Sequence, residues 1–402
     1  MSQRILIVAA RRTPFGRFRG RLAAHSPVSL ATAVADAVCS DAVSSDVDRS
    51  QISQLILGQV LAAGHGMNTA RQVALSSGLA ETSTAVTLNM MCGSGLKALA
   101  LAAQAIHAGE ARAVLAGGVE SMSQSPLLVQ RPGRGQQPDV TQLRDSMVTD
   151  GLRDVRIDQH MGETAERLAR EFSISRAEQD AWALHSQTSF AAAQAAGYFS
   201  DELVPLGELT GDEHPRPEVT AEELAGLKPV FADDGTVTAG NSSGINDGAA
   251  LVVLAEESLV RERGWPVLCE WVGVAETGCD PQRMGLGPVH ALRRLLQKHQ
   301  LSLHDIDQLE INEAFAAQVL ACLQELQRES DTRGDWSAGL KRTVNPHGGA
   351  IAVGHPLSAS GARLAVHLAW QIARGRVRTA ACALCIGGGM GIAALLRAAD
   401  GF

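Results

Sequence analysis

The chain has 402 residues, 45% of them hydrophobic and 19% charged, so it can bury a large core and is not expected to be disordered. Its net charge of −8 argues against non-specific binding of nucleic acid, and no apolar run reaches the ~20 residues that a membrane-spanning helix needs. Seven cysteines without the spacing of a secreted disulfide scaffold favour a reducing compartment. We therefore expect a soluble cytoplasmic protein of two or three domains.

Short apolar strands alternate with helical stretches over the first 120 residues. The sequence predicts strands at 5–8, 55–57 and 113–116, and helices at about 28–44 and 96–108. Such alternation favours a mixed α/β sheet with helices on both of its faces.

A group of arginines follows the first predicted strand: Arg11, Arg12, Arg17, Arg19 and Arg21. We favour a solvated turn for this group, because charged runs mostly face water. The alternative is a surface that attracts an anionic ligand carrying phosphate.

The middle of the chain differs in composition from both ends. Residues 121–150 are polar and rich in Pro and Gly, which is typical of a loop. Two helices follow, and the second has a capping box formed by Ser175 and Glu178 and a stop signal at Gly197. We interpret residues 121–252 as a loop domain inserted between two related halves.

The two ends of the chain resemble each other. Residues 54–58 and 308–312 have similar strand sequences, and each half has a helix of small and apolar residues bounded by glycines 14 positions apart, at 95 and 109 and at 361 and 375. An internal duplication explains this, and it places a site where the halves meet. The predicted domains are an N-terminal half (1–120, returning at 253–272), the insertion (121–252) and a C-terminal half (273–402).

Cys92 ends a predicted strand and precedes a helix, within Cys-Gly-Ser-Gly at 92–95. The positive end of a helix dipole favours a thiolate, which is what a nucleophilic cysteine needs. A small buried core residue is the alternative.

His355 lies between Gly354 and Pro356, and the proline keeps it out of the helical conformation. A histidine on such a rigid turn is suited to act as a base toward a thiol, although a structural histidine is equally compatible with the pattern.

Cys382 and Cys385 form a C-x-x-C pair that invites a redox or zinc interpretation. We reject both, because residues three apart in a strand point to opposite faces and no second ligand pair is evident. Cys382 is expected in the core and Cys385 at the strand end, beside glycines 387–389 whose N–H groups could bind an oxyanion. These glycines are a weak signal for dinucleotide binding.

Asn312 follows a predicted strand and precedes a helix. From the local pattern we favour a helix cap, and the alternative is an amide that orients a water molecule.

Together these segments resemble the thiolase family, in family order along nearly the whole chain: Cys-Gly-Ser-Gly at 92–95, Asn-Glu-Ala-Phe at 312–315, Gly-His-Pro at 354–356 and Cys-Ile-Gly-Gly-Gly at 385–389. Segments 13–16, 160–162 and 239–248 also fit. The chain departs from many members at His347 and Ser358, neither of which is a catalytic position of the family.

The resemblance implies two duplicated βαβαβαββ halves in a layered α/β/α/β/α core with an inserted loop domain. It also implies site roles. Cys92 would be acylated, His355 would take its proton, and Cys385 would act as acid and base on the second substrate. Asn312 would hold a water in one oxyanion hole together with His355, and the N–H groups of Cys92 and Gly387 would form the other.

For the ligand, the resemblance implies acyl-CoA and CoA as substrates, with no cofactor and no metal. The residues expected at the CoA and acyl groups are Ser243, His160, Met161 and Met284. The expected reaction is condensation of two acetyl-CoA molecules to acetoacetyl-CoA, or its reverse, and the expected assembly is a homodimer or homotetramer in which the 127–144 loop takes part.

Several alternatives stay open at this point. Within the family, a 3-ketoacyl-CoA thiolase of fatty-acid β-oxidation with longer acyl chains is possible, and so is a non-catalytic lipid-binding relative. A ketoacyl synthase acting on carrier-protein substrates is disfavoured by the Cys385 motif, and a nicotinamide oxidoreductase rests only on glycine turns.

Overall fold

The computed structural model describes residues 4–40, 47–329 and 343–402. Within these residues ten strands form one mixed sheet. In the order in which they lie side by side, the strands are β12 (Gln308–Ile311), β13 (Thr379–Ile386), β14 (Met390–Arg397), β11 (Cys269–Gly278), β1 (Ile5–Arg12), β10 (Asn246–Glu256), β5 (Ala113–Ser121), β3 (Ile52–Gly58) and β4 (Thr84–Leu88), with β2 (Gly16–Arg17) paired to β10.

The pairing pattern occurs twice. β3 pairs in parallel with β5, β5 antiparallel with β10, and β10 antiparallel with β1. In the other half β12, β13, β14 and β11 pair with one another in the same series of directions. The halves join where Leu6 and Ile7 of β1 pair with β11. This repeat agrees with the duplication that the sequence predicts.

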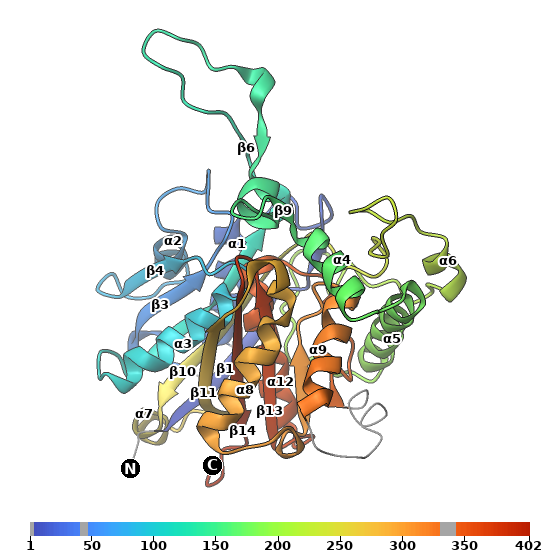
Figure 1. Cartoon of the computed structure of the whole chain (residues 1–402). Coiled ribbons are helices and arrows are strands. Elements are labelled where there is room, and N and C mark those ends of the chain that lie inside the picture. Colours follow the sequence, from blue (N-terminus) through green and yellow to red (C-terminus); the bar gives the residue numbers. More distant parts are fainter. Residues whose placement is uncertain (1–3, 41–46, 330–342) are drawn as a thin grey trace.

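The two halves of the sheet and the helices that pack on them form layers (Figure 1). α3 (Ser94–His107) and α12 (Leu357–Ala373) pack together between the two half-sheets. α1 (Pro27–Ser40) and α2 (Thr69–Ser76) cover the outer face of the N-terminal half. α8 (Gly287–His299) and α9 (Ala316–Glu329) cover the outer face of the C-terminal half.

Strand alternation explains these layers. In β1, Ile5 and Ile7 join the core between the half-sheets, whereas Leu6 and Val8 join the core under α1. Every other side chain of a strand points to the same face, so a strand buried on both faces reads as a continuous apolar run.

The middle of the chain forms α4 (Met161–Glu171), α5 (Arg176–Ala195) and α6 (Ala221–Ala225), which lie together beside the C-terminal half in Figure 1. α5 begins with the predicted capping box of Ser175 and Glu178. A hairpin arm formed by β6 (Leu127–Leu128) and β7 (Arg144–Asp145) projects from the body. β10 begins at Asn246, so residues 246–252 lie in the sheet, although the sequence analysis placed them in the insertion. The division into domains otherwise stays a prediction.

The predicted arginine group is split by the fold. Arg17 on β2 and Arg19 and Arg21 on the turn that follows are exposed. Arg12, however, is fully buried, where it pairs with Glu202 (2.7 Å) and Asp212 (2.6 Å). The prediction of a solvated turn is therefore wrong for Arg12, and it is also wrong for Arg11, which is 4% exposed and lies on β1. Buried cations need such partners.

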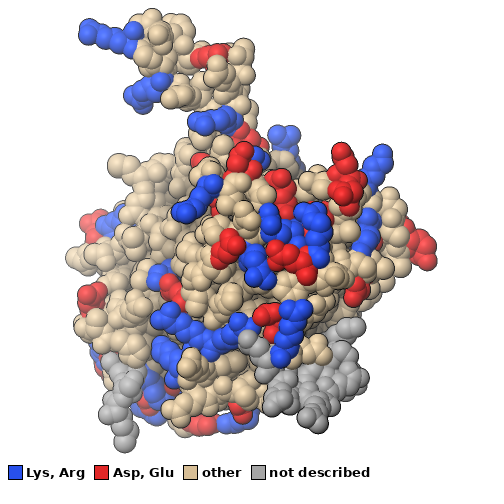
Figure 2. All heavy atoms as spheres, viewed as in Figure 1, with Lys and Arg blue, Asp and Glu red and all other residues tan. Residues whose placement is uncertain are grey.

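Acidic and basic side chains lie intermixed on the face shown in Figure 2. Among the described residues, no helix combines the length and apolar character needed to cross a bilayer.

Candidate active site

A cavity of about 310 Å³ opens at the seam of the two halves and the middle segment. Four of the residues predicted to carry chemistry line it: Cys92, His355, Cys385 and Gly387. The four predicted substrate-binding residues also line it: His160, Met161, Ser243 and Met284. These residues come from six distant segments of the chain and meet around one cavity.

Cys92 lies on the turn between β4 and α3. The preceding residue, Met91, has a left-handed backbone (φ 48°), which is uncommon for a side chain of its size. The turn is held by Asn89, whose side chain accepts from the Met91 N–H (2.8 Å), and by Ser94, whose hydroxyl accepts from the Met90 N–H (2.8 Å). This tight turn directs the Cys92 thiol into the cavity.

The N-terminal turns of α3 and α12 touch through their backbones. A Cβ atom added to Gly95 would lie 2.3 Å from the carbonyl oxygen of Ser358, and one added to Gly118 would lie 2.1 Å from the same atom. Only glycine permits this approach. Because Cys92 precedes one helix and His355 precedes the other, the close crossing brings both side chains to the same cavity.

The thiol of Cys92 is not poised as a thiolate. Burial raises its pKa to about 11, although the Gly387 N–H stabilises the charged sulfur, and the nearby Glu120 carboxylate raises the pKa further. The direction of this shift is opposite to the one that the helix start predicts, because burial disfavours the charged sulfur.

His355 is held on its turn from two sides. Gly354 before it has a left-handed backbone (φ 105°), and the His355 N–H donates to Oδ1 of Asn246 (3.0 Å). The ring nitrogen Nδ1 lies 2.5 Å from Oγ of Ser360, one turn into α12, whereas Nε2 is buried and has no partner among the described residues. The unpartnered nitrogen is the one available to the ligand.

Burial lowers the pKa of His355 to about 4, so at neutral pH the imidazole is uncharged and can accept a proton. Burial therefore opposes transfer of the proton from Cys92 to His355, because it raises the pKa of the thiol and lowers the pKa of the imidazole, and the attraction between the resulting ions offsets part of this cost. If Nδ1 donates to Ser360, the lone pair is on Nε2, which is the tautomer that a base needs.

Cys385 is the penultimate residue of β13, and Gly387 opens the turn that follows. Cys385 faces the cavity, whereas Cys382 faces the core between the half-sheets, so the C-x-x-C pair separates as predicted. Burial and the neighbouring Cys92 raise the pKa of Cys385 well above its ordinary value. A thiolate formed there is consequently a strong base.

Asn312 does not cap a helix, contrary to the preferred prediction. α9 begins only at Ala316, whose N–H donates to the carbonyl oxygen of Asn241 (2.9 Å). The Asn312 side chain is 2% exposed, and its Nδ2 has no hydrogen-bond partner among the described residues. An unmet buried donor is unusual, and the alternative interpretation, an amide that orients a water, is consistent with it.

Glu313 anchors the segment that carries Asn312 to its surroundings. One carboxylate oxygen accepts from Nε1 of Trp182 (3.1 Å) and Nδ2 of Asn345 (3.0 Å). The other accepts from the hydroxyl of Ser186 (2.6 Å) and the N–H of Ile351 (3.1 Å). This carboxylate therefore ties α5 to the segment that leads to His355, a role that sequence reasoning missed because its partners are distant in the chain.

Glu120 is a second buried carboxylate beside the cavity that the sequence did not indicate. It accepts from the backbone N–H groups of Leu61 (2.9 Å), Val60 (3.1 Å) and Ser358 (3.3 Å). Burial raises its pKa to about 6, and these donors oppose the shift. It connects β5, the loop after β3 and the start of α12, and so supports both sides of the site.

The far wall of the cavity comes from the middle segment. The His160 ring caps α4 by accepting from the Gly162 N–H (3.1 Å), and it stacks on Phe231 with centroids 4.9 Å apart. Met161 and Met284 pack with Phe231 and Cys385 in one apolar cluster. The wall is therefore mostly apolar, which suits a neutral acyl group.

The described residues contain no group of three or more His, Cys, Asp or Glu side chains arranged to hold a metal ion. The residues that line the cavity include two thiols and the imidazole of His355, which are groups of nucleophilic and acid–base chemistry.

Two family models match nearly the whole chain. "Thiolase, N-terminal domain" matches residues 5–258, and "Thiolase, C-terminal domain" matches residues 265–398. The acetyl-CoA acetyltransferase of Pseudomonas aeruginosa is 45% identical over 98% of this chain and 99% of its own. A protein of Escherichia coli K12 named probable acetyl-CoA acetyltransferase is 46% identical over 97% and 98%, respectively.

Solved structures agree with this assignment. The crystal structure of the Bacillus anthracis acetyl-CoA acetyltransferase matches with a TM-score of 0.91 and 40% identity, over 99% of both chains. Human mitochondrial 3-ketoacyl-CoA thiolase in complex with CoA matches with a TM-score of 0.91 and 39% identity, over 99% of this chain and 98% of its own. The predicted fold is confirmed, and the chain belongs to the thiolase family of acyltransferases.

Proposed function

We propose that this protein is an acetyl-CoA acetyltransferase, which condenses two acetyl-CoA molecules to acetoacetyl-CoA and CoA or catalyses the reverse cleavage. The observation that supports it most directly is the meeting of two thiols, one imidazole and a glycine turn around a single apolar cavity. Relatives with 43–46% identity over nearly the whole chain carry this name.

In the first half-reaction, the Cys92 sulfur attacks the thioester carbonyl carbon of acetyl-CoA. His355 accepts the Cys92 proton at Nε2, and the bond to the CoA sulfur breaks to leave an acetylated Cys92. The departing CoA sulfur takes the proton of Cys385. The N–H groups of Cys92 and Gly387 stabilise the oxyanion, and the absence of bulk water makes such donors effective.

In the second half-reaction, the Cys385 thiolate removes an α-proton from a second acetyl-CoA. Its high pKa suits this task, because thioester α-protons are weakly acidic. The enolate oxygen is stabilised by His355 and by a water held by Asn312. The new carbon–carbon bond releases the Cys92 sulfur, which recovers its proton from His355, so that both thiols end protonated.

Ser243 and His160 would contact the CoA moiety, and Met161 and Met284 the acyl group. Coenzyme A thioesters serve as substrates, and we propose no bound cofactor or metal. We further propose a cytoplasmic location and a homodimer or homotetramer, with the projecting β6–β7 arm as an assembly element. Exposed apolar side chains on this arm support that role: Leu127 is 60% exposed and Val140 is 67% exposed.

Thiolytic cleavage across a series of 3-ketoacyl-CoA chain lengths tests the proposal. We expect the highest kcat/KM for the four-carbon substrate and a steep fall as the chain grows, since Met161, Met284 and Phe231 close the cavity. The similarity to human mitochondrial 3-ketoacyl-CoA thiolase makes a preference for longer chains the second candidate. Equal or rising kcat/KM beyond six carbons would favour that candidate, and no cleavage at any length would favour a non-catalytic lipid-binding protein.

A further inference from the structure

One wall of the cavity is a loop without regular secondary structure. Thr238, Ala239, Ser242 and Ser243 all line the cavity and all belong to this loop. The loop has no continuous ladder of backbone hydrogen bonds. Isolated ones join it to the segment before α9, such as the bond from the Ser243 N–H to the Ala314 carbonyl oxygen (3.0 Å). Side-chain partners therefore contribute to where these residues lie.

Asn241 lies at the centre of the loop and is fully buried. Its Oδ1 accepts from the N–H of Thr238 (2.8 Å), and its Nδ2 donates to the carbonyl oxygen of Thr236 (3.0 Å). The same Nδ2 donates to Oδ1 of Asp180 on α5 (2.9 Å). The amide therefore closes the loop on itself and fastens it to α5, immediately before the cavity-lining Ser242 and Ser243.

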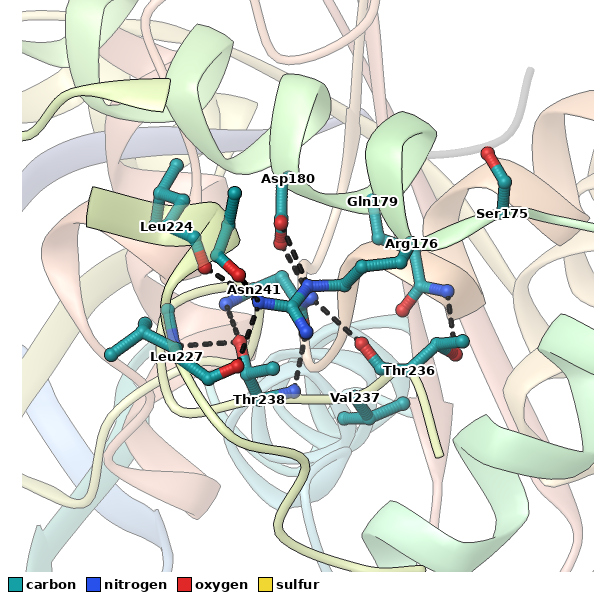
Figure 3. A network of polar contacts seen from close by, with 12 residues as sticks. Ser175, Arg176, Gln179, Asp180, Leu224, Leu227, Thr236, Val237, Thr238 and Asn241 are labelled. Carbon is teal, nitrogen blue, oxygen red and sulfur yellow. Dashed lines mark hydrogen bonds and ion pairs between the residues drawn. The ribbon is translucent and has the colours of Figure 1, made fainter. Parts of the chain in front are cut away.

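Asp180 in turn is held by Arg176, one turn earlier on α5 (Figure 3). Arg176 Nε donates to Oδ2 of Asp180 (2.7 Å), and its NH2 group donates to the carbonyl oxygens of Leu224 (2.6 Å) and Leu227 (2.9 Å). The Leu224 carbonyl lies in the last turn of α6 and the Leu227 carbonyl lies just beyond it, where the helix itself supplies few donors. Figure 3 shows the guanidinium between the α6 carbonyls and the Asp180 carboxylate.

A second carboxylate holds the start of the loop. Glu166 on α4 accepts from the N–H groups of Thr236 (2.8 Å) and Val237 (2.8 Å), and Nε2 of Gln179 donates to the Thr236 hydroxyl (2.9 Å). The loop is thus hydrogen-bonded to Glu166 on α4 and to Asp180 on α5. Both acceptors are carboxylates, which form stronger hydrogen bonds than neutral acceptors.

We propose that Asp180 is a positioning residue for binding of the CoA thioester. Asp180 accepts from Arg176, which also binds the carbonyl oxygens at the end of α6, and from Asn241, which holds the loop. In this way Asp180 sets the distance between this wall of the cavity and the two thiols. The inference rests on the proposed function, because it assumes that this wall contacts the CoA moiety. Asp180 touches neither the cavity nor a reacting group.

Asp180→Asn keeps the shape and removes the charge. An amide offers one acceptor oxygen where the carboxylate offers two, so either Arg176 or Asn241 loses its partner. We expect KM for acetoacetyl-CoA and for CoA to rise about tenfold, with kcat changed by less than about threefold. The rate at which iodoacetamide alkylates Cys92 should stay at the wild-type value, because that small reagent does not use the loop.

A matched control is Glu257→Gln, which breaks another i,i+4 pair with arginine, on α7 (Glu257–Arg263) at the other end of the molecule. It should leave KM, kcat and alkylation unchanged. Arg176→Lys keeps the charge but cannot serve Asp180 and two carbonyls together, so a smaller rise in KM is expected from it.

Unchanged KM values in Asp180→Asn would overturn the inference, and so would a parallel loss of kcat, alkylation and folded fraction, since that pattern indicates only a structural role. Should Asp180→Asn not fold, an unchanged KM in Arg176→Lys overturns it instead. A wild-type enzyme that cleaves no 3-ketoacyl-CoA contradicts the proposed function, whereas an active wild type with unaffected variants contradicts the inference alone.

Discussion

Replacing Ser360 by alanine tests how His355 is prepared to act as a base. Its hydroxyl lies 2.5 Å from Nδ1 of His355 in a buried environment. A hydrogen bond from imidazolium contributes about 1.5–3 kcal/mol and one from neutral imidazole about 0.5–1.5 kcal/mol. The difference, about 1–2 kcal/mol, is gained only as the ring becomes charged, so we expect Ser360→Ala to lower kcat/KM by about 5–30-fold.

The assay is steady-state cleavage of acetoacetyl-CoA, with alkylation of Cys92 as a second measure. Ser358→Ala is a matched control, because Ser358 is buried on the same helix and its hydroxyl donates to the carbonyl oxygen of Val119 at the same distance of 2.5 Å. The control should lose stability without a comparable loss of kcat/KM. Equal rates in wild type and Ser360→Ala, or equal losses in both variants, would refute the reasoning.

Three further predictions follow from buried groups. Because burial raises the pKa of Cys92 to about 11, its alkylation by iodoacetamide should rise about tenfold per pH unit from pH 7 to pH 10, and a plateau below pH 8 would indicate a resting thiolate. Asn312→Ala should lower turnover by about 10²–10³-fold while the free energy of urea unfolding shifts by less than about 1 kcal/mol, since Nδ2 has no hydrogen-bond partner in the part of the chain that the structure describes. A large loss of stability would contradict this. Burial alone would raise the pKa of Glu202, but Arg12 and His367 lower it to about 2. The ionised Glu202 therefore stabilises the fold above pH 4.5, and this contribution is lost as the pH falls toward 2. Glu202→Gln should lower the free energy of urea unfolding at pH 7 by about 3–5 kcal/mol, and equal urea midpoints for wild type and variant at that pH would contradict this.

The duplicated sheet could be predicted because its signals are local. Apolar runs mark the strands, and glycines bound the α3 and α12 helices in both halves. Gly95 has a physical reason to be glycine, since any Cβ there would collide with the Ser358 backbone. The separation of Cys382 from Cys385 follows from strand alternation alone, and it is observed.

The site residues were predicted where motifs mark them and missed where contacts are distant. Ser360 and Glu120 carry no local signal, because a buried hydroxyl or carboxylate is defined by its neighbours in the fold. Arg12 was misplaced for the same reason: its partners Glu202 and Asp212 are about 190–200 residues away in sequence. Local pattern thus finds residues that line the cavity, whereas long-range packing selects the residues that hold them.

The protonation state of Cys92 shows a further limit. A helix start predicts a thiolate, yet burial reverses the direction of the pKa shift. The extent of burial depends on how the loop after β3, α12 and the middle segment close around the sulfur, which the order of residues near position 92 does not reveal.

Mass spectrometry of Cys385→Ala after incubation with acetyl-CoA tests the central claim most directly. With the second thiol absent, condensation stops. Acylation can still proceed, because the CoA sulfur can leave as a thiolate without the proton of Cys385. The peptide containing Cys92 should therefore accumulate an acetyl group that added CoA removes. An acetyl group on another residue, or an unmodified Cys92 in a folded variant that still forms acetoacetyl-CoA, would contradict the account.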